Sequence, residues 1–498
     1  MPDQTASSQP LPWSQEQKLT ADDAVAGIGF GDSGALGDGV ALIGATATGL
    51  ANLSAGAVYV LKWNESEGMW QHATKLTADD GELDDRFGWS VAISGDAAVI
   101  GAPDVGGVGA KSGAAYVFRR VDGAWQQEQK LSADDAPAGD RFGRSVSVSG
   151  DVAVVGAPDA DGDGGPTGAA YVFRWDGTAW QQEQKLQVGS FATIASFGAS
   201  VAALGDRLLI GVPRAGPGAQ NLGAAYVFRW DSTEAKWLDE QRLSASDENP
   251  QDMFGSSVAL SDSIALIGVP ADEDGGSAAG AAYVFRWDGE TWQEEQKLLA
   301  DDADAGDRFG DAVALSGDVA VVGSPNDDND GGLSAGGSYI FEWNGASWDQ
   351  TTKLTADDSG IGDHFGESVA VGGDRILVGA SNNDDGGESA GSAYVFSRGA
   401  TETAVEDVPE PSSQLALLTY PNPFRQRAIL SYELSRSGWV RLAVYDILGR
   451  QVMQPVDEQR PAGSHTFVFD VRTLPPGVYF ARVETANEVA TSRMVHME

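Results

Sequence analysis

Residues 142–186 read FGRSVSVSGDVAVVGAPDADGDGGPTGAAYVFRWDGTAWQQEQKL, a segment made of four short β-type runs. The runs are Ser145–Val148, Val152–Pro158, which proline ends, Gly168–Trp175 and Trp180–Leu186. Between the last two lies an Asp-Gly step, a strong hairpin signal because the turn that fits strand twist needs positive φ. No run has the length or period of a helix. The segment therefore predicts one antiparallel sheet of four strands.

The same pattern, Phe-Gly … Gly-Ala-Pro … Ala-Tyr-Val-Phe, occurs seven times along the chain. Its Phe-Gly pairs begin at Phe30, Phe87, Phe142, Phe197, Phe254, Phe309 and Phe365, so successive starts differ by 57, 55, 55, 57, 55 and 56 residues. A fixed period of this size indicates a repeat architecture. One sheet leaves two apolar faces bare, and seven sheets packed face to face around an axis bury them. The sequence thus predicts an all-β fold with a seven-bladed β-propeller over residues 1–397.

The chain ends of this region predict how the ring closes. Seven strands of the type Trp … Lys/Arg-Leu begin at Trp13, Trp70, Trp125, Trp180, Trp237, Trp292 and Trp348. The first precedes the first Phe-Gly, and the last Tyr-Val-Phe strand, at Tyr394, has none after it. We expect Trp13–Leu19 to pair with the Tyr394 strand, which removes an exposed sheet edge. The recurrent tryptophans are expected to pack between blades, although Trp125, Trp180 and Trp292 offer an alternative as sugar-stacking rings.

Composition restricts the partners. The net charge is −41 and the isoelectric point about 4.2, which argues against nucleic acid and anionic membrane surfaces. Such acidity suits a salt-rich environment, and a calcium-loaded propeller explains it equally well. With no cysteine, thiol catalysis and cysteine–zinc sites are excluded. No apolar stretch approaches the ~20 residues of a membrane span, and residues 1–10 lack a signal-peptide core, so we expect any export leader to be missing from this chain.

A second domain follows a change in composition. Residues 398–416 are polar and contain the stiff Pro409-Glu410-Pro411, which indicates a linker. Residues 417–498 hold six or seven short strand-like runs separated by turn residues. This pattern predicts a small Ig-like β-sandwich.

Four motifs in this second domain carry a resemblance. They are Tyr420–Phe424 (YPNPF), Val444–Arg450 (VYDILGR), Leu474–Phe480 (LPPGVYF) and Arg493–Val495 (RMV). Residues 417–498 resemble the C-terminal sorting domain of the type IX (Por) secretion system. The resemblance implies the type IX machinery as a partner, passage across the outer membrane, and a secreted or cell-surface location.

The first domain resembles the FG-GAP repeat family, a propeller repeat also found in integrin α-chains. Phe142-Gly143, Gly156-Ala157-Pro158 and Tyr171-Val172-Phe173 are among the matching residues, and the resemblance covers about 13–397. The integrin type carries its calcium loop just before Gly-Ala-Pro. Here that position is the short turn Ser149-Gly150-Asp151, so those ligands do not carry over.

A different loop, directly after Gly-Ala-Pro, is acidic in several repeats. Alternate carboxylates in a loop bent by glycine can surround Ca²⁺, which takes six to eight oxygen ligands. The candidate ligands are Asp159, Asp161 and Asp163 in the third repeat, Asp272 and Asp274 in the fifth, Asp327, Asp328 and Asp330 in the sixth, and Asp384 and Asp385 in the seventh. The alternative is a solvated turn, since Asp and Asn tolerate tight backbone angles.

Catalytic patterns do not emerge from the sequence. The four histidines, His72, His364, His465 and His496, are not clustered, and no Gly-x-Ser-x-Gly elbow occurs. We therefore expect no enzymatic activity, and instead an acidic extracellular scaffold for binding or adhesion to a protein or glycan ligand, stabilised by calcium. The alternatives are a polysaccharide-acting enzyme with its site in the propeller funnel and an architectural surface-layer protein. The funnel site would involve the deviating segments Thr46–Leu53 and Arg214–Asn221.

Overall fold

The structure is a computed structural model, which describes residues 12–46, 55–106, 111–135, 138–162, 165–188, 195–216, 220–398, 417–420, 427–434, 438–446, 450–460, 463–470, 475, 477–485 and 489–496. Within these residues every regular element is a β-strand. The predicted all-β class is confirmed. The chain divides into two compact units, residues 1–401 and 402–498.

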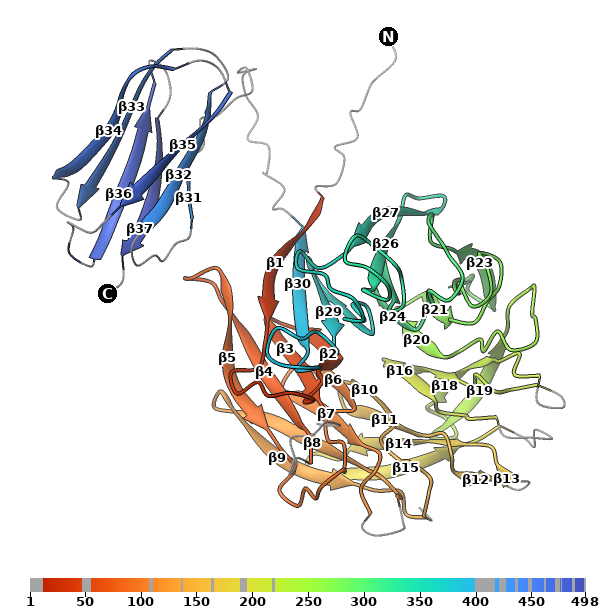
Figure 1. Cartoon of the computed structure of the whole chain (residues 1–498). Coiled ribbons are helices and arrows are strands. Elements are labelled where there is room, and N and C mark those ends of the chain that lie inside the picture. The colour runs from red at the N-terminus through yellow and green to blue at the C-terminus, as the bar shows by residue number, and fades with distance from the viewer. Residues whose placement is uncertain are drawn as a thin grey trace. The chain divides into compact units, whose positions relative to one another are not determined.

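The first unit consists of seven four-stranded antiparallel sheets arranged around an axis (Figure 1). Blade 1 is β2 (Phe30–Gly37), β3 (Val40–Ala45), β4 (Ala57–Asn64) and β5 (Met69–Leu76); blade 2 is β6 (Ser90–Ser94), β7 (Ala97–Ala102), β8 (Ala114–Val121) and β9 (Ala124–Leu131); blade 3 is β10 (Ser145–Ser149), β11 (Val152–Ala157), β14 (Ala169–Trp175) and β15 (Trp180–Leu186). Blade 4 is β16 (Ser200–Leu204), β17 (Arg207–Gly211), β18 (Ala225–Asp231) and β19 (Lys236–Leu243); blade 5 is β20 (Ser257–Leu260), β21 (Ile264–Val269), β22 (Ala281–Trp287) and β23 (Trp292–Leu298); blade 6 is β24 (Ala312–Ser316), β25 (Val319–Ser324), β26 (Gly337–Trp343) and β27 (Trp348–Leu354). Blade 7 joins β28 (Ser368–Gly372), β29 (Arg375–Ala380) and β30 (Ser392–Arg398) to β1 (Trp13–Leu19). β12 (Asp161–Gly162) and β13 (Gly165–Pro166) form a short two-stranded ribbon in the connection between β11 and β14 of blade 3.

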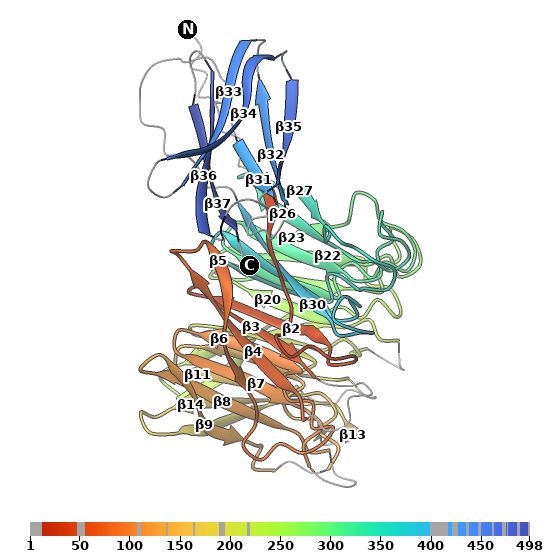
Figure 2. The ribbon, with the colours of Figure 1, turned by 60° about the vertical axis from the view of Figure 1, so that its left-hand side comes forward.

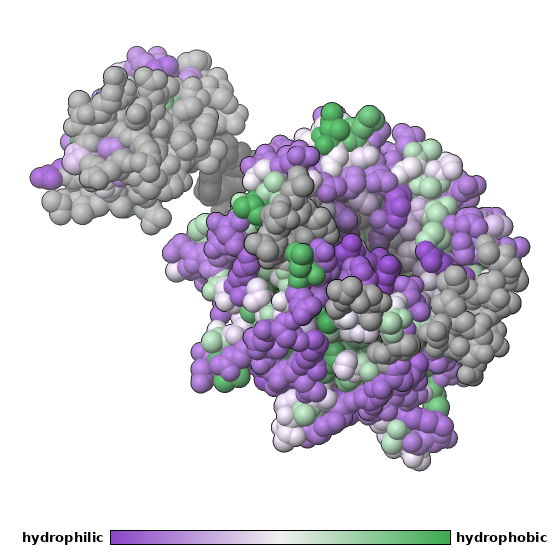
Figure 3. All heavy atoms as spheres, turned by 60° about the horizontal axis from the view of Figure 1, so that its bottom comes forward, coloured by the Kyte–Doolittle hydropathy of each residue, from purple (hydrophilic) through white to green (hydrophobic). Residues whose placement is uncertain are grey.

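The first strands of the blades line the axis. Each contacts the first strand of both neighbouring blades, from β2 and β6 around the ring to β28 and β2. The seven-bladed propeller predicted from the period is therefore confirmed. Hydrophilic side chains cover most of the face shown in Figure 3, with hydrophobic residues scattered among them, as expected for a chain of net charge −41.

The N-terminal strand completes blade 7. β1 runs antiparallel to β30, with Trp13 opposite Arg398 and Leu19 opposite Ala393. This pairing joins strands from the two ends of the propeller sequence. It leaves β30 hydrogen-bonded on both sides, because β29 is its other neighbour.

Aromatic side chains fill the space between blades. Phe142 is fully buried and meets Tyr171 and Phe173 edge-on, with ring centroids 5.5 and 6.0 Å apart. At the outer edge, Trp180 is buried and exchanges two 2.8 Å hydrogen bonds with Gln129 of the preceding blade. Trp292 is buried in the same way against Gln241. These two tryptophans pack between blades as predicted and are not presented to a sugar.

The second unit is built from two sheets (Figure 2). One contains β31 (Leu417–Tyr420), β32 (Arg427–Leu434) and β35 (Gly463–Asp470); the other contains β34 (Gln451–Arg460), β33 (Gly438–Asp446), β36 (Gly477–Glu484) and β37 (Val489–His496). Their shared core includes Leu430 and Tyr432 from the first sheet and Val440, Leu442 and Met494 from the second. This is a β-sandwich. Its assignment as Ig-like stays a prediction.

Candidate functional site

The Phe-Gly step of each repeat forms a tight turn at the start of the blade. The residue before Phe has left-handed backbone in all seven repeats: Gly29 (φ 65°), Arg86 (58°), Arg141 (54°), Ser196 (61°), Met253 (63°), Arg308 (59°) and His364 (56°). Its carbonyl accepts a hydrogen bond from the backbone N–H three residues later, at 3.1 Å from Trp89 to Arg86 and from Arg144 to Arg141. Left-handed backbone costs a non-glycine residue of order 1–3 kcal/mol, and such strain concentrates at functional sites.

The glycine of this turn is required by its surroundings. Gly143 has φ 92°, and a Cβ on it would lie 2.2 Å from the carbonyl oxygen of Ala114. The Phe-Gly pair is therefore a structural device that repeats in every blade. The residue that follows is under no such restriction.

That following residue is of six different types in the seven blades, and all seven line one pocket of about 510 Å³. We call these residues the axial ring: Asp32, Trp89, Arg144, Ala199, Ser256, Asp311 and Glu367. Because each blade contributes the equivalent position, the pocket lies on the propeller axis. Arg141, Ser196 and Arg308 from the turns, with Asp159 and Arg214 from the loops after the second strands, complete its charged and polar lining, and Met253 adds an apolar side chain.

Serine side chains fix the axial ring in place. The Ser directly after the ring residue donates its hydroxyl to the Gly carbonyl of the next blade's Phe-Gly. The six bonds are Ser33 to Gly88 (2.7 Å), Ser90 to Gly143 (3.0 Å), Ser145 to Gly198 (2.9 Å), Ser200 to Gly255 (2.9 Å), Ser257 to Gly310 (2.8 Å) and Ser368 to Gly31 (2.7 Å). Blade 6 has Ala312 at this position and lacks the bond. The hydroxyls thus couple each turn to its neighbour around the axis.

One side of the pocket is rich in arginine. The Arg144 guanidinium lies 4.2 Å from the ring centroid of Trp89, and Arg86 lies 5.2 Å from the same ring. Arg141 pairs with Asp159 at 3.3 Å, and Arg308 with Asp311 at 2.8 Å. Burial, followed by the charges of Arg141 and Arg86, lowers the pKa of Arg144 to about 10. Three guanidinium groups, those of Arg86, Arg141 and Arg144, therefore gather at blades 2 and 3, and Asp104 and Asp159 balance two of them.

Two carboxylates belong to the adjoining blades 7 and 1. Asp32 accepts hydrogen bonds from the hydroxyl and the backbone N–H of Thr46, and Glu367 accepts one from the hydroxyl of Ser381. Burial, with the charge of Glu367 as a further cause, raises the pKa of Asp32 to about 7. A carboxyl group that titrates near neutrality can serve as a proton donor or acceptor.

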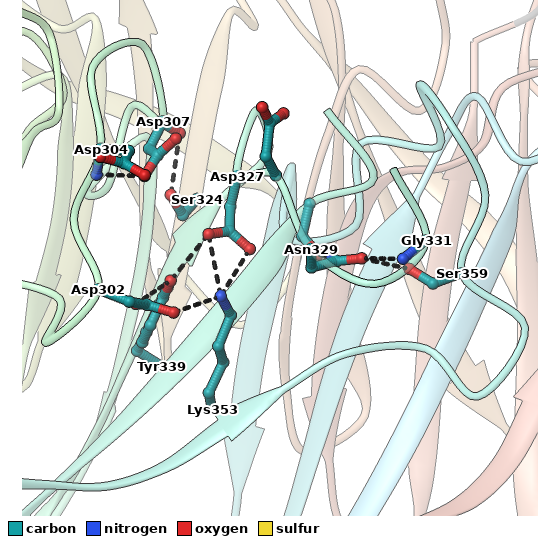
Figure 4. A network of polar contacts seen from close by, with 12 residues as sticks. Asp302, Asp304, Asp307, Ser324, Asp327, Asn329, Gly331, Tyr339, Lys353 and Ser359 are labelled. Atoms are coloured by element: carbon teal, nitrogen blue, oxygen red, sulfur yellow. Dashed lines mark hydrogen bonds and ion pairs between the residues drawn. The ribbon is translucent and has the colours of Figure 1, made fainter. Parts of the chain in front are cut away.

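Three of the predicted calcium ligands of blades 5 and 6 contact a lysine: Asp272 and Asp274 in blade 5, and Asp327 in blade 6. Lys353 contacts Asp302 at 2.7 Å and Asp327 at 2.9 Å, and Tyr339 donates to both carboxylates (Figure 4). In blade 5, Lys297 lies 2.9 Å from Asp247, 2.8 Å from Asp272 and 2.6 Å from Asp274. Although burial opposes it, hydrogen bonds to Asp272 and Asp274 raise the pKa of Lys297. An ammonium group thus neutralises these carboxylates.

The other candidate ligands are dispersed. Asp385 pairs with Lys18 at 2.5 Å, while Asp384 and Asp328 accept backbone N–H groups of their own loops at 2.7 Å. Asp330 is exposed, and Asp159 pairs with Arg141. The side chain of Asp161 and the whole of Asp163 lie outside the described residues. Within the described residues, no group of three or more His, Cys, Asp or Glu side chains is placed to hold a metal ion.

A family model for the FG-GAP repeat matches seven segments of the chain, at residues 13–61, 70–118, 125–173, 180–228, 237–285, 292–341 and 348–396. The chain belongs to the FG-GAP repeat family. A second model, for the secretion system C-terminal sorting domain, matches residues 418–497. The FG-GAP propeller is therefore exported by type IX secretion to the outer cell surface, and the sorting tail engages that machinery. No helix in the described residues has the length and apolar character to cross a membrane.

Solved structures similar to this FG-GAP protein are distant. PorZ of Porphyromonas gingivalis, a bacterial surface component of the type IX secretion system, is 11% identical with a TM-score of 0.46; the match covers 96% of this chain and 61% of PorZ. The FG-GAP chain thus spans less than two thirds of PorZ. Sqt1 of Saccharomyces cerevisiae is 10% identical with a TM-score of 0.42, covering 77% of this chain and 99% of Sqt1. No curated protein sequence matches.

The axial ring of this FG-GAP propeller is absent from the sequence predictions. The deviating segments of repeats one and four do point to it, since Arg214 lines the pocket and Thr46 binds Asp32. Residues 47–53 and 217–219 of those segments lie outside the described residues. The missed signal is the variable residue after an otherwise constant Phe-Gly. This residue is recognised as a pocket-lining position only when it is known that all seven Phe-Gly turns meet at the propeller axis.

Proposed function

We propose that this surface protein is a non-catalytic binding or adhesion protein whose extracellular ligand enters the axial pocket. The observation that carries the proposal is the axial ring: the residue after Phe-Gly is of six types in seven repeats, whereas Phe and Gly are constant and Ser follows in six of the seven. Phe, Gly and Ser at adjoining positions are held by packing, a backbone contact and a hydrogen bond, so they repeat. Different side chains at equivalent positions around one pocket are what recognition of an asymmetric ligand needs.

The pocket has the properties of a ligand site. Its volume of about 510 Å³ lies within the range of roughly 300–1,000 Å³ usual for small-molecule sites. It combines an aromatic ring, guanidinium groups and carboxylates on a rigid scaffold of strands. A side chain or a sugar unit that projects from a larger protein or glycan fits such a pocket.

A binding screen with the whole chain tests this proposal. The probes are glucose, glucosamine, glucuronate and trialanine, measured by calorimetry and by thermal shift. We expect at least one probe to bind, and Trp89→Ala to weaken that binding about 10-fold, the effect of losing about 1.4 kcal/mol. Trp439→Ala is the matched control, because Trp439 is exposed in the second unit. Absence of any probe whose binding depends on Trp89 would refute the proposal.

A polysaccharide-cleaving enzyme is the second candidate. The Asp32–Glu367 pair favours it, since such enzymes use two carboxyl groups, one of them with a raised pKa. Release of reducing ends from acidic and neutral polysaccharides is the discriminating assay. Turnover that is lost in Asp32→Asn, with binding retained, would establish the enzyme; binding without turnover supports the non-catalytic function.

Calcium and integrin-like adhesion belong to the proposal as well. We propose the loop of the third repeat for calcium because of its alternating sequence Asp161-Gly162-Asp163-Gly164; in the loops of blades 5 to 7, Asp272, Asp327 and Asp385 are paired with lysine. A surface-layer role remains a third class of function, and it predicts self-assembly of the purified protein at high salt.

A further inference from the structure

The axial pocket concentrates arginine in a strongly acidic chain. The sequence has 32 Lys and Arg against 73 Asp and Glu, yet Arg141, Arg144, Arg214 and Arg308 line this one pocket. Arg86 adds a fifth guanidinium through its contact with Trp89. General surface composition does not account for this concentration.

Three of these arginines have carboxylate partners and two do not. Arg86 pairs with Asp104 at 3.2 Å, Arg141 with Asp159 and Arg308 with Asp311. Across the part of the chain that the structure describes, neither Arg144 nor Arg214 forms an ion pair. Arg144 is partly buried and rests on Trp89, whereas Arg214 is exposed at the pocket.

The position of Arg144 is electrostatically unfavourable in the free protein. It is desolvated and lies near the like charges of Arg141 and Arg86, which the carboxylates of Asp159 and Asp104 offset only in part. An anion beside Arg144 would compensate both costs at once. Arg214 stands in the fourth repeat where the third repeat carries Asp159, and it is exposed at the pocket without a carboxylate partner among the described residues.

We propose that the axial pocket binds a single oxoanion group of its ligand, a carboxylate, sulfate or phosphate, on Arg144 and Arg214. This inference rests on the proposed function and names the chemistry of its ligand. A planar guanidinium matches the oxygens of such groups with two parallel hydrogen bonds. Asp32, Asp311 and Glu367 line the same pocket. They repel further negative charge and accept hydrogen bonds from hydroxyl or ammonium groups, so a ligand with one anionic group and an otherwise polar body is favoured.

Binding of small probes to the whole chain tests the inference. The probes are glucuronate, inorganic sulfate and inorganic phosphate, with glucose as the neutral probe and sodium chloride at matched ionic strength as background. We expect glucuronate or one of the inorganic anions to bind, and Arg144→Gln and Arg214→Gln each to weaken it about 10-fold or more. Which of the three anions binds best distinguishes a carboxylated, sulfated or phosphorylated ligand.

Two controls keep the outcome interpretable. Arg120→Gln removes an arginine of blade 2 that pairs with Asp96 away from the pocket, and binding should not change. Arg144→Lys keeps the charge and loses the planar fork, so an intermediate affinity is expected. If Arg144→Gln fails to fold, the exposed Arg214→Gln still decides the matter.

The failures are distinguishable. Anion binding that is unchanged in Arg214→Gln and Arg144→Gln, or no anion binding at all, overturns the inference. If glucose then binds in a manner that depends on Trp89, the proposed function stands with a neutral ligand. If no probe depends on Trp89 either, both proposals fail.

Discussion

Single buried aspartates hold the turns that present the axial ring. The Asp two residues before Phe accepts the backbone N–H three residues before itself, at 2.8 Å for both Asn249 to Asp252 and Asp304 to Asp307. Asp252 is 3% exposed and Asp307 5% exposed. Burial, with the nearby carboxylates of Asp272 and Asp327 as further causes, raises the pKa of each to about 6.

These raised pKa values predict a stability that falls as pH rises. The folded state keeps protons on Asp252 and Asp307 that the unfolded chain releases, so stability declines between about pH 4 and pH 6. Asp252→Asn with Asp307→Asn keeps the acceptor oxygen and removes the charge. The double variant should be more stable than the wild type at pH 7.5, and the difference should shrink toward pH 4.5. Denaturant unfolding at constant ionic strength measures it.

Asp176 provides the control of opposite sign. Hydrogen bonds from the Thr178 hydroxyl and from the backbone N–H groups of Ala179 and Thr178 hold its pKa well below the usual range. Asp176→Asn should therefore cost stability at pH 7.5 and progressively less as pH falls. If the stability gained by the Asp252/Asp307 double variant over the wild type grows on acidification, the raised pKa values of Asp252 and Asp307 are contradicted.

At the scale of elements, the serine hydroxyls predict how strongly neighbouring blades are coupled. Ser257→Ala removes the 2.8 Å bond to the Gly310 carbonyl and should lower the unfolding free energy by about 1 kcal/mol. Ala312 sits opposite Gly323 as Ser257 sits opposite Gly268, so Ala312→Ser should donate to the Gly366 carbonyl and gain a similar amount. Urea unfolding of both variants is the measurement. Equal unfolding free energies of Ala312→Ser and the wild type would show that a serine hydrogen bond in blade 6 does not stabilise the propeller.

The closing strand supports a second prediction at this scale. β1 contributes Lys18, which lies 2.5 Å from Asp358, and Glu16, which lies 2.9 Å from Arg375. Deleting residues 1–19 exposes the edge of β30 and should lower the melting temperature and promote aggregation. Adding a synthetic peptide of residues 12–19 should restore part of the loss. A truncated chain that melts like the wild type would mean that blade 7 is stable with three strands.

The sequence predicted the strands well and their side-chain contacts poorly, for a definable reason. Blades 1 to 6 are each local in sequence, so turn residues and the Phe-Gly period were sufficient for them, and the unpaired first Trp … Leu strand predicted the closure of blade 7. The prediction of calcium in the acidic loops did not take Lys297 and Lys353 into account. These lysines lie on the fourth strand of the same blade and contact Asp272 and Asp327. The axial ring depends on contacts among all seven repeats. Neither the lysine–carboxylate contacts nor the axial ring can be predicted from the spacing of a single motif.

At the scale of the whole molecule, the charge of −41 sets the response to salt. Most lysines of the propeller pair with aspartates of the loops, as Lys75 does with Asp23 and Lys185 with Asp135. Few lysines are therefore left to neutralise the other Asp and Glu side chains. Sodium chloride should raise the melting temperature by screening self-repulsion. This general effect has to be separated from any specific ion.

Calcium binding is the prediction that requires this separation. At matched ionic strength, calcium should raise the melting temperature beyond magnesium or sodium, because a ligand that binds only the folded state stabilises it by mass action. The extra rise should disappear in Asp161→Asn with Asp163→Asn, which remove the loop acids of the third repeat. It should persist in the charge-matched Asp384→Asn with Asp385→Asn, since Asp385 is already paired with Lys18. Equal melting temperatures in calcium and magnesium would contradict a specific calcium site in the acidic loops.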